Sequence, residues 1–264
     1  MDIADALDAR EGTTCVVGAG GKKTTLYALA DRLDRAVVTA SVRIPIFDRE
    51  VADVTVTDDP VAAVADADRE AWPLGLVPER ERSDRYRGYD AETVGAVGVA
   101  HDGPVLVKAD GARTRDFKAP SDREPQLPAG ADTVVPIASV AAVGEPLDEA
   151  TVHHPERVAA LTDLEAGEEI TPTAVATVLA AADGGLKDVP SNATVVALLN
   201  KVDDAEREAL ARKVADRLLA RTDRVDRVVL AAMREPSVVD VVEPMGDAGG
   251  ESPRNATDEE GTEP

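Results

Sequence analysis

A glycine-rich segment between an apolar strand and a helix constrains this chain more than any other feature. Residues 13–17 are β-branched or apolar, which is typical of a buried strand, and residues 24–33 have a helical pattern. The sequence between and into them is Gly18-Ala19-Gly20-Gly21-Lys22-Lys23-Thr24-Thr25. Glycines let backbone amides turn toward an anion, and the start of a helix adds the positive end of its dipole. The segment therefore predicts a phosphate-binding loop.

The match to the standard phosphate loop is incomplete, because that pattern requires glycine, four residues, glycine, lysine and then serine or threonine. If Gly21-Lys22 is the central step, Lys23 occupies the hydroxyl position; if Lys23-Thr24 is, Lys22 stands where glycine is expected. Lys22 and Lys23 thus compete for the phosphate, and Thr24 and Thr25 compete for a magnesium ion. We favour Lys22 on the phosphate, as a catalytic residue, and Thr24 on the metal. The alternative is a glycine-rich turn that binds nothing.

Short β-branched runs alternate with helical stretches, which indicates an α/β fold with a mainly parallel sheet flanked by helices. Strands are expected over residues 13–17, 36–39, 51–57, 104–110, 132–137, 194–199 and 225–230. Helices are expected over residues 24–33, 61–68, 90–99, 155–161, 172–182 and 204–220. We predict one domain, similar to phosphate-loop NTPases, over residues 1–243. It carries loop insertions near 78–89 and 113–128, and a disordered acidic tail follows over 244–264.

The charge of the chain argues against several partners. With 51 acidic and 29 basic residues, its net charge is −22, so it should repel nucleic acid and anionic membranes. A polyanionic ligand then needs a local patch of positive potential. The sequence has neither a long apolar run nor a signal-peptide pattern, so we expect a cytoplasmic protein. Its acidic, lysine-poor composition favours a protein that works in high salt, the alternative being an ordinary acidic protein.

The segment Asn200-Lys201-Val202-Asp203 follows an apolar strand and resembles the Asn-Lys-x-Asp element of GTP-binding proteins. An aspartate can accept hydrogen bonds from the N1–H and the exocyclic amino group of guanine, which adenine does not offer. The stem of Lys201 can lie along the base face, and Asn200 can tie neighbouring loops together. The alternative is a helix N-cap, because Asp203 and Asp204 directly precede the helical pattern.

Asp110 ends an apolar strand, where phosphate-loop NTPases place an acid beside magnesium. We interpret Asp110 as a catalytic residue that shares the metal with Thr24, the alternative being an aspartate in a turn. The predicted cofactor is Mg²⁺ with GTP or ATP. Arg113 and Arg115 could stabilise phosphate charge, although solvated arginines are the commoner case.

Seven short segments occur in a characteristic order: Val17 to Lys22, Val38 to Ser41, Lys108 to Arg113, Phe117 to Pro120 with Glu124-Pro125, His154 to Arg157, Gly184 to Lys187, and Asn200 to Asp203. This order resembles the YqeC family, described as accessory proteins for selenium-dependent molybdenum hydroxylases. The resemblance runs from about residue 13 to residue 230. It implies a phosphate-loop NTPase-like fold and a role in maturing such an enzyme. The site residues it implies are Gly18, Gly20, Gly21, Lys22, Asp110 and Lys118. The chain departs from the family at Lys23, where threonine is usual.

Three functions remain open at this point. The protein could hydrolyse GTP or ATP to deliver a cofactor to a molybdenum hydroxylase or its maturation machinery. It could instead be a non-hydrolysing module whose docking loops are ordered by a nucleotide, which Lys23 in the hydroxyl position favours. It could also be a small-molecule kinase, which the Asn-Lys-x-Asp element argues against because kinases rarely need to read guanine.

Overall fold

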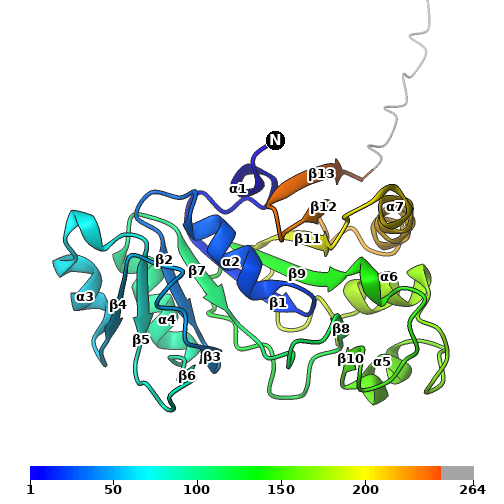
Figure 1. Cartoon of the computed structure of the whole chain (residues 1–264), viewed down its shortest axis with the longest axis horizontal. Coiled ribbons are helices and arrows are strands. Elements are labelled where there is room, and N and C mark those ends of the chain that lie inside the picture. Colours follow the sequence, from blue (N-terminus) through cyan, green and yellow to red (C-terminus); the bar gives the residue numbers. More distant parts are fainter. Residues whose placement is uncertain (245–264) are drawn as a thin grey trace, which may run out of the picture.

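A nine-stranded sheet crosses the molecule in the computed structural model, which describes residues 1–244 (Figure 1). In spatial order its strands are β13 (Ser237–Val242), β12 (Arg227–Ala232), β11 (Thr194–Asn200), β9 (Thr133–Ser139), β1 (Thr13–Gly18), β7 (Val105–Lys108), β2 (Val37–Ala40), β5 (Leu74–Val77) and β4 (Asp53–Val56). Neighbouring strands are parallel except for β12 and β13. The predicted α/β fold with a mainly parallel sheet is confirmed. The acidic tail predicted over 244–264 lies, beyond residue 244, outside the described residues.

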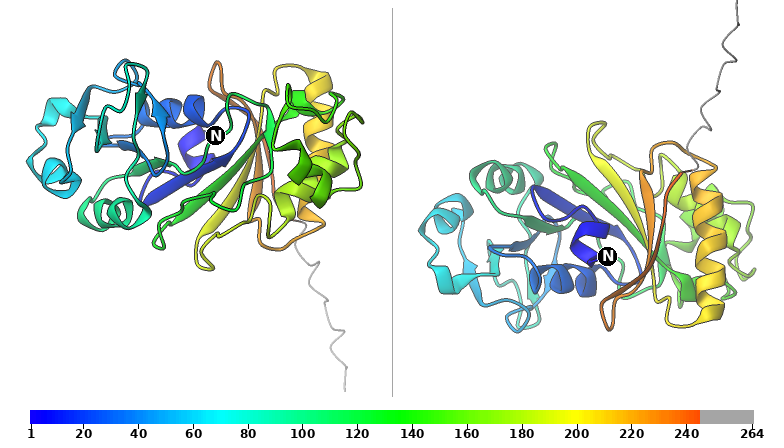
Figure 2. Two further views of the ribbon diagram at one scale, coloured as in Figure 1. Left: turned by 90° about the horizontal axis from the view of Figure 1, so that it is seen from below. Right: turned by 90° about the horizontal axis from the view of Figure 1, so that it is seen from above.

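Helices cover both faces of this sheet (Figure 2). One face carries α1 (Ile3–Ala6) and α2 (Lys22–Ala30), and the opposite face carries α3 (Pro60–Asp66), α4 (Ala91–Ala100), α5 (Pro155–Leu161), α6 (Pro172–Ala180) and α7 (Ala205–Leu219). Two small sheets, β3 (Ile44–Pro45) with β6 (Arg85–Tyr86) and β8 (Phe117–Lys118) with β10 (Val152–His153), lie apart from it. Among the described residues, none of the helices combines the length and apolar character that crossing a membrane requires.

The central strands are buried on both faces, which explains their continuous apolar sequence. In β1, Val16 packs into the cluster that contains α2, while Cys15 and Val17 pack into the cluster that contains α4. A parallel sheet covered on both faces has no solvent-facing positions that would impose an alternating pattern. Cys15 itself is fully buried among apolar neighbours.

Strands are added to the sheet on one side of β1 and later on its other side, so β1 lies at a topological switch point. From β1 the chain passes through α2 to β2 on one side of the sheet, with β7 later inserted between them. It then builds β9 and β11 on the other side. In open parallel sheets, ligands bind beyond the carboxyl ends of the strands at such a switch point. The glycine-rich loop follows β1, so the fold places it at this crevice.

Two strands of the sheet were not expected from the sequence. β5 has four residues with Gly75 in its middle, and it follows Pro73, so its local signals indicate a turn. β13 is an antiparallel edge strand that carries Asp240 and is more exposed than the central strands. Both strands depend on pairing with a distant neighbour, which short local patterns do not record.

Candidate functional site

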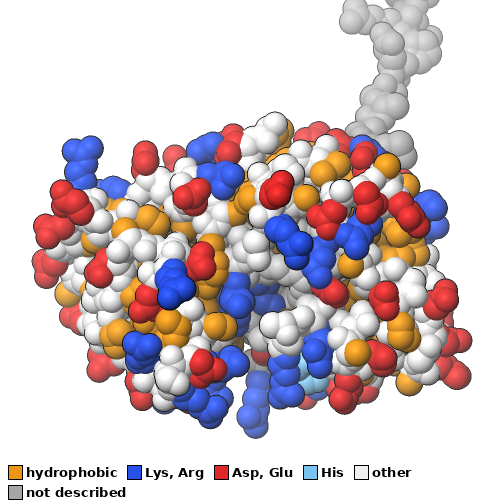
Figure 3. All heavy atoms as spheres, in the orientation of Figure 1, with side chains coloured by type: hydrophobic (Ala, Val, Ile, Leu, Met, Phe, Trp, Pro, Cys, Tyr) orange, Lys and Arg blue, Asp and Glu red, His pale blue; other side chains and the backbone are white. Residues whose placement is uncertain are grey.

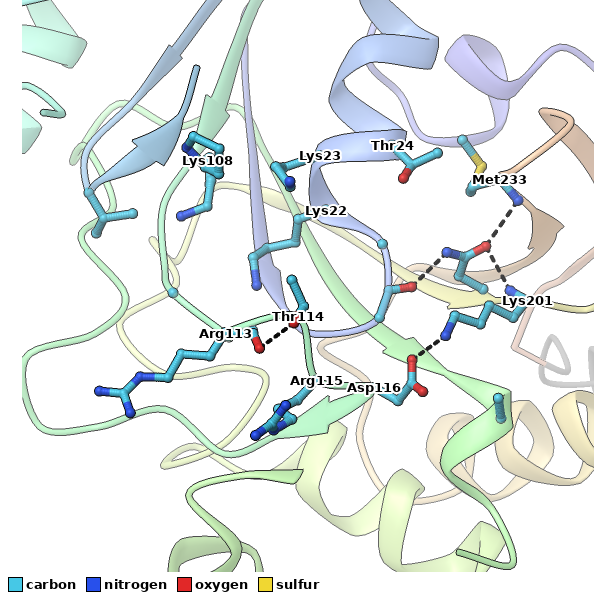
Figure 4. A pocket seen from close by; sticks show the side chains of 18 of the residues that line it. Lys22, Lys23, Thr24, Lys108, Arg113, Thr114, Arg115, Asp116, Lys201 and Met233 are labelled. Atoms are coloured by element: carbon cyan, nitrogen blue, oxygen red, sulfur yellow. Dashed lines mark hydrogen bonds and ion pairs between the residues drawn. The ribbon is translucent and has the colours of Figure 1, made fainter. Parts of the chain in front are cut away.

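A pocket of about 1180 Å³ opens beyond the carboxyl ends of β1, β7 and β11 (Figure 4). Within residues 1–244, ten lysines and arginines line it, against three acidic residues. The basic residues are Lys22, Lys23, Arg43, Arg85, Lys108, Arg113, Arg115, Lys201, Arg207 and Arg234. Figure 3 shows blue side chains gathered around a hollow at the centre of this face. The pocket is therefore a patch of positive potential on a strongly acidic protein, and it attracts anions.

The glycine-rich loop forms one wall of the pocket. Gly20 has a left-handed φ of +88°, and a Cβ there would lie 2.6 Å from the Ser139 nitrogen, so glycine is required. The first hydrogen bond of α2 runs from the Thr25 N–H to the Gly21 carbonyl. The amides of Lys22, Lys23 and Thr24 precede that bond, at the positive end of the helix dipole. This wall therefore combines backbone donors and ammonium groups.

A buried ionic cluster lies beneath the loop. The Lys22 ammonium is 2.8 Å from Asp110 Oδ1, and the Lys118 ammonium is 3.0 Å from Oδ2 of the same carboxylate. The Gly18 N–H donates to Asp110 Oδ2 over 2.8 Å. Lys118 also pairs with Glu124 at 2.8 Å. Asp110 thereby fixes both the loop backbone and the lysine that follows it.

The electrostatics of this cluster keep Asp110 charged. Burial by itself would raise the pKa of the Asp110 carboxyl, but the ammonium groups of Lys22 and Lys118 and the Gly18 amide hold that pKa below its usual range. Burial lowers the pKa of Lys22, although the negative charge of Asp110 acts in the opposite direction by stabilising the ammonium form. Asp110 is thus a buried anion whose role is to hold cations.

Thr24 and Asp110, the two residues expected to bind magnesium, do not face the same cavity. Thr24 is exposed on the first turn of α2 and lines the pocket. Asp110 does not line that pocket; it faces a separate cavity of about 20 Å³ beneath the loop, and both of its oxygens face lysines. Thr25 is also turned away, because its hydroxyl donates to the Gly21 carbonyl at 3.2 Å. Thr24 and Asp110 therefore do not face a common site in this structure, and their sharing of a metal stays a prediction.

Lys108, for which the sequence suggested no role, lies at the opposite end of the pocket from Lys201 (Figure 4). Its ammonium donates to the carbonyls of Asp110 at 2.6 Å and Arg43 at 3.0 Å. Burial, together with the positive charge of Lys22, lowers the pKa of Lys108 to about 7. The one sequence feature that could have pointed to Lys108 is its position as a lysine at the end of an otherwise apolar strand.

Replacing Lys108 by methionine should remove a pH dependence of the free energy of unfolding. The folded-state pKa of about 7 lies below the ordinary lysine value, so between them the unfolded chain binds more protons and stability rises with pH. One such proton contributes at most about 1.4 kcal/mol per pH unit. Urea denaturation at a series of pH values from about 7 to about 10 measures this slope. Equal slopes in the variant and the original protein would contradict the assignment.

The Asn200–Asp203 segment forms the other end of the pocket. The Asn200 amide donates to the Gly20 carbonyl over 2.6 Å, and its oxygen accepts from the Met233 N–H over 3.0 Å. Lys201 pairs with Asp116, as Figure 4 shows. Asp203 lines the rim, where its Oδ2 accepts from Arg207 at 2.6 Å. Asn200 thus joins this segment directly to the glycine-rich loop.

Most of the residues proposed for ligand binding meet at this pocket. Those that line it are Gly20, Gly21, Lys22, Lys23, Thr24, Asn200, Lys201 and Asp203. Gly18, Ala19 and Thr25 do not, because they lie behind the loop or on the buried side of α2. Sequence reasoning missed several arginines that reach the pocket from separate loops, namely Arg43, Arg85, Arg207 and Arg234.

Glu124, His153 and His154 place possible ligand atoms within 4.8 Å of one another, beside the ionic cluster. Glu124 is already engaged, because Oε1 accepts from the Gly111 N–H at 2.7 Å and Oε2 pairs with Lys118. Burial, with His154 and Lys118 nearby, lowers the pKa of His153 to about 4. The nearby cations oppose a metal ion here.

The resemblance to the YqeC family is confirmed by comparison with known proteins. The family model described as YqeC protein matches residues 14–156, more than half of the 264 residues. The chain belongs to the YqeC family. A curated YqeC relative, the uncharacterized protein YqeC of Escherichia coli (strain K12), is 23% identical over 196 residues, covering 72% of this chain and 76% of that protein. The part matched by the YqeC model contains the glycine-rich loop, Asp110 and Lys118, and it ends before Asn200.

Proposed function

We propose that this YqeC protein binds a guanine nucleotide in the basic pocket and serves as an accessory or maturation factor for a molybdenum hydroxylase. The observation that carries the nucleotide part is a glycine-rich loop and a helix N-terminus that bring Lys22 and Lys23 to one end of this basic pocket. Helix amides, lysines and arginines are the groups that bind phosphates in proteins. On a chain of net charge −22, such a local excess of positive charge fits a polyanionic ligand.

In this proposal Lys22 and Lys23 bind the phosphates together with the first amides of α2. Lys22 lies 2.8 Å from Asp110 before the ligand arrives, so it must turn toward the phosphate. Lys118 stays paired with Asp110, and the buried carboxylate therefore keeps a partner when Lys22 leaves. Asp110 and Lys118 act as positioning residues. No step is assigned to magnesium, because Asp110 is not directed at the pocket.

The base is placed at the Asp203 end of the pocket. Asn200 joins this end to the phosphate loop through the Gly20 carbonyl, so the two parts of the ligand site have a fixed relation. Arg207 holds Asp203 at the rim through Oδ2, where the carboxylate can accept from guanine. The role in maturing a molybdenum hydroxylase rests on the resemblance of the sequence segments to the YqeC family.

The first candidate function includes hydrolysis of the bound GTP, and nucleotide binding without hydrolysis is the second candidate function. It is favoured by two observations, that Asp110 is held by lysines and that Lys23 occupies the position where a magnesium-binding hydroxyl is usual. A phosphate-release assay with GTP separates the two candidates. Sustained release of phosphate that is lost in Lys22→Ala would establish hydrolysis, and the absence of release from a protein that binds GTP would establish the second candidate.

Replacing Asp203 by alanine should weaken GTP binding at least about tenfold, by about 1.4 kcal/mol, and leave ATP binding unchanged. The reason is that only guanine offers the two donors that Asp203 would accept. Calorimetric titration with both nucleotides measures the change. Asp204→Ala is the matched control, since Asp204 caps α7 through the Arg207 N–H and does not line the pocket. If the preference for GTP survives in Asp203→Ala, the base-reading role is refuted.

A further inference from the structure

The pocket is larger than its proposed nucleotide requires. Small-ligand sites usually measure about 300–1,000 Å³, and this one measures about 1180 Å³. The nucleotide would extend from the first turn of α2 to Asp203. In Figure 4 the pocket continues past Lys22 in the other direction, toward Lys108 and Arg113. The pocket therefore has a second end, lined by residues other than those proposed to bind the nucleotide.

Basic groups from separate segments meet at this second end. Lys108 comes from the end of β7 and Arg113 from the loop after it. Arg85 comes from β6, where it pairs with Pro45 of β3, close to the Arg43 carbonyl that accepts from Lys108. Arg43 also lies here, but Glu81 neutralises it through two bonds of 2.6 Å. Arg85 meets Asp84 at 3.5 Å, and within residues 1–244 Arg113 takes part in no ion pair. The second end therefore keeps positive charge that the protein itself does not neutralise.

The loop that carries Arg113 has a strained backbone and is fixed to the phosphate loop. Arg113 and Thr114 both have left-handed φ values, +46° and +62°, which are strained for residues other than glycine. The loop is fastened to the phosphate loop, because the Gly20 N–H donates to the Arg115 carbonyl over 3.0 Å. An anion bound by Arg113 would consequently lie next to the phosphates of the nucleotide.

We infer that the end lined by Arg85, Lys108 and Arg113 is a second anion subsite, which takes a phosphate-bearing small molecule beside the nucleotide. This rests on the proposed function, which places the nucleotide at the opposite end. Guanidinium groups bind phosphate oxygens in pairs, and Lys108 adds a single donor from the floor of the pocket. Val42 and Pro45 provide apolar surface for the rest of such a molecule. The protein would thereby hold two anionic ligands in contact.

The test uses inorganic pyrophosphate as the probe, titrated into the full chain saturated with a non-hydrolysable GTP analogue. Pyrophosphate is expected to bind the saturated protein. Combining Arg85→Ala with Arg113→Ala should weaken pyrophosphate at least about tenfold and leave affinity for the GTP analogue unchanged. Arg82→Ala is the matched control, an exposed arginine just before β6 that does not line the pocket. Arg85 and Arg113 are exposed, so these changes should leave the fold intact.

The outcomes separate this inference from the proposed function. If pyrophosphate binds the free protein but not the nucleotide-saturated protein, the pocket has one anion site and the second subsite is refuted, while nucleotide binding stands. If the GTP analogue does not bind at all, the proposed function fails. In that case pyrophosphate binding that needs Arg85 and Arg113 but survives Lys22→Ala would still support the subsite. Binding that is insensitive to Arg85 and Arg113 would overturn it.

Discussion

Replacing Asp110 by alanine is expected to destabilise the fold by about 3–5 kcal/mol. The change leaves the ammonium groups of Lys22 and Lys118 facing each other, buried, without the carboxylate that separates them. It also removes the acceptor of the Gly18 N–H. Urea denaturation at neutral pH measures the loss. Because the folded-state pKa of Asp110 is lowered, its contribution is complete above its unfolded pKa and is lost as the pH falls through the folded value.

The control for this prediction is Asp122→Ala. Asp122 also pairs with a cation, Arg157, at 2.9 Å, but its side chain is 86% exposed, and such pairs contribute about 0–1 kcal/mol. If Asp110→Ala costs no more stability than Asp122→Ala, the buried cluster does not hold the loop as described. Adding Lys22→Met to Asp110→Ala should recover part of the lost stability, because one unpaired ammonium is then removed.

Replacing Lys22 by methionine is expected to weaken GTP binding at least about a hundredfold, or about 2.7 kcal/mol. Methionine keeps the length of the side chain and removes the charge that would meet the phosphates. The loss should be the same for GTP and ATP, since Lys22 would not contact the base. Lys213→Met, an exposed change on α7 away from the pocket, should bind as the original protein does. Equilibrium dialysis with labelled nucleotide gives the affinities.

The same experiment decides between the two adjacent lysines. Lys23 is half-buried and lines the pocket, while Lys22 begins beneath the loop in contact with Asp110. If Lys23→Met abolishes binding and Lys22→Met does not, Lys23 is the phosphate lysine. Lys22 would then be a structural partner of Asp110.

The sequence predicted the phosphate-type loop and the parallel sheet because both depend on local patterns. Glycines, a strand before them and a helix after them stand within about 20 consecutive residues, and switch-point topology then brings strand ends together. Asp110 was predicted to end a strand, and it lies two residues beyond the end of β7. The direction of its side chain could not be predicted, because it depends on Lys118, which lies under the loop on β8. No local pattern records that return.

The second end of the pocket could not be predicted for a related reason. Arg85 and Arg113 lie in charged segments where solvated arginines are the ordinary case, and only the fold brings them beside Lys108. Asn200 is the opposite case. Its motif is local, and the contact with the Gly20 carbonyl places it where a loop-joining residue is expected.

The most direct test of the nucleotide pocket is a calorimetric titration of GTP and ATP into the purified protein in high salt, with Mg²⁺ and then with a chelator. We predict that GTP binds at least about tenfold more tightly than ATP, and that the chelator leaves GTP affinity unchanged because lysines bind the phosphates. Equal affinity for both nucleotides would remove the guanine role of Asp203 and keep the phosphate loop. If neither nucleotide binds, the nucleotide-binding proposal is contradicted.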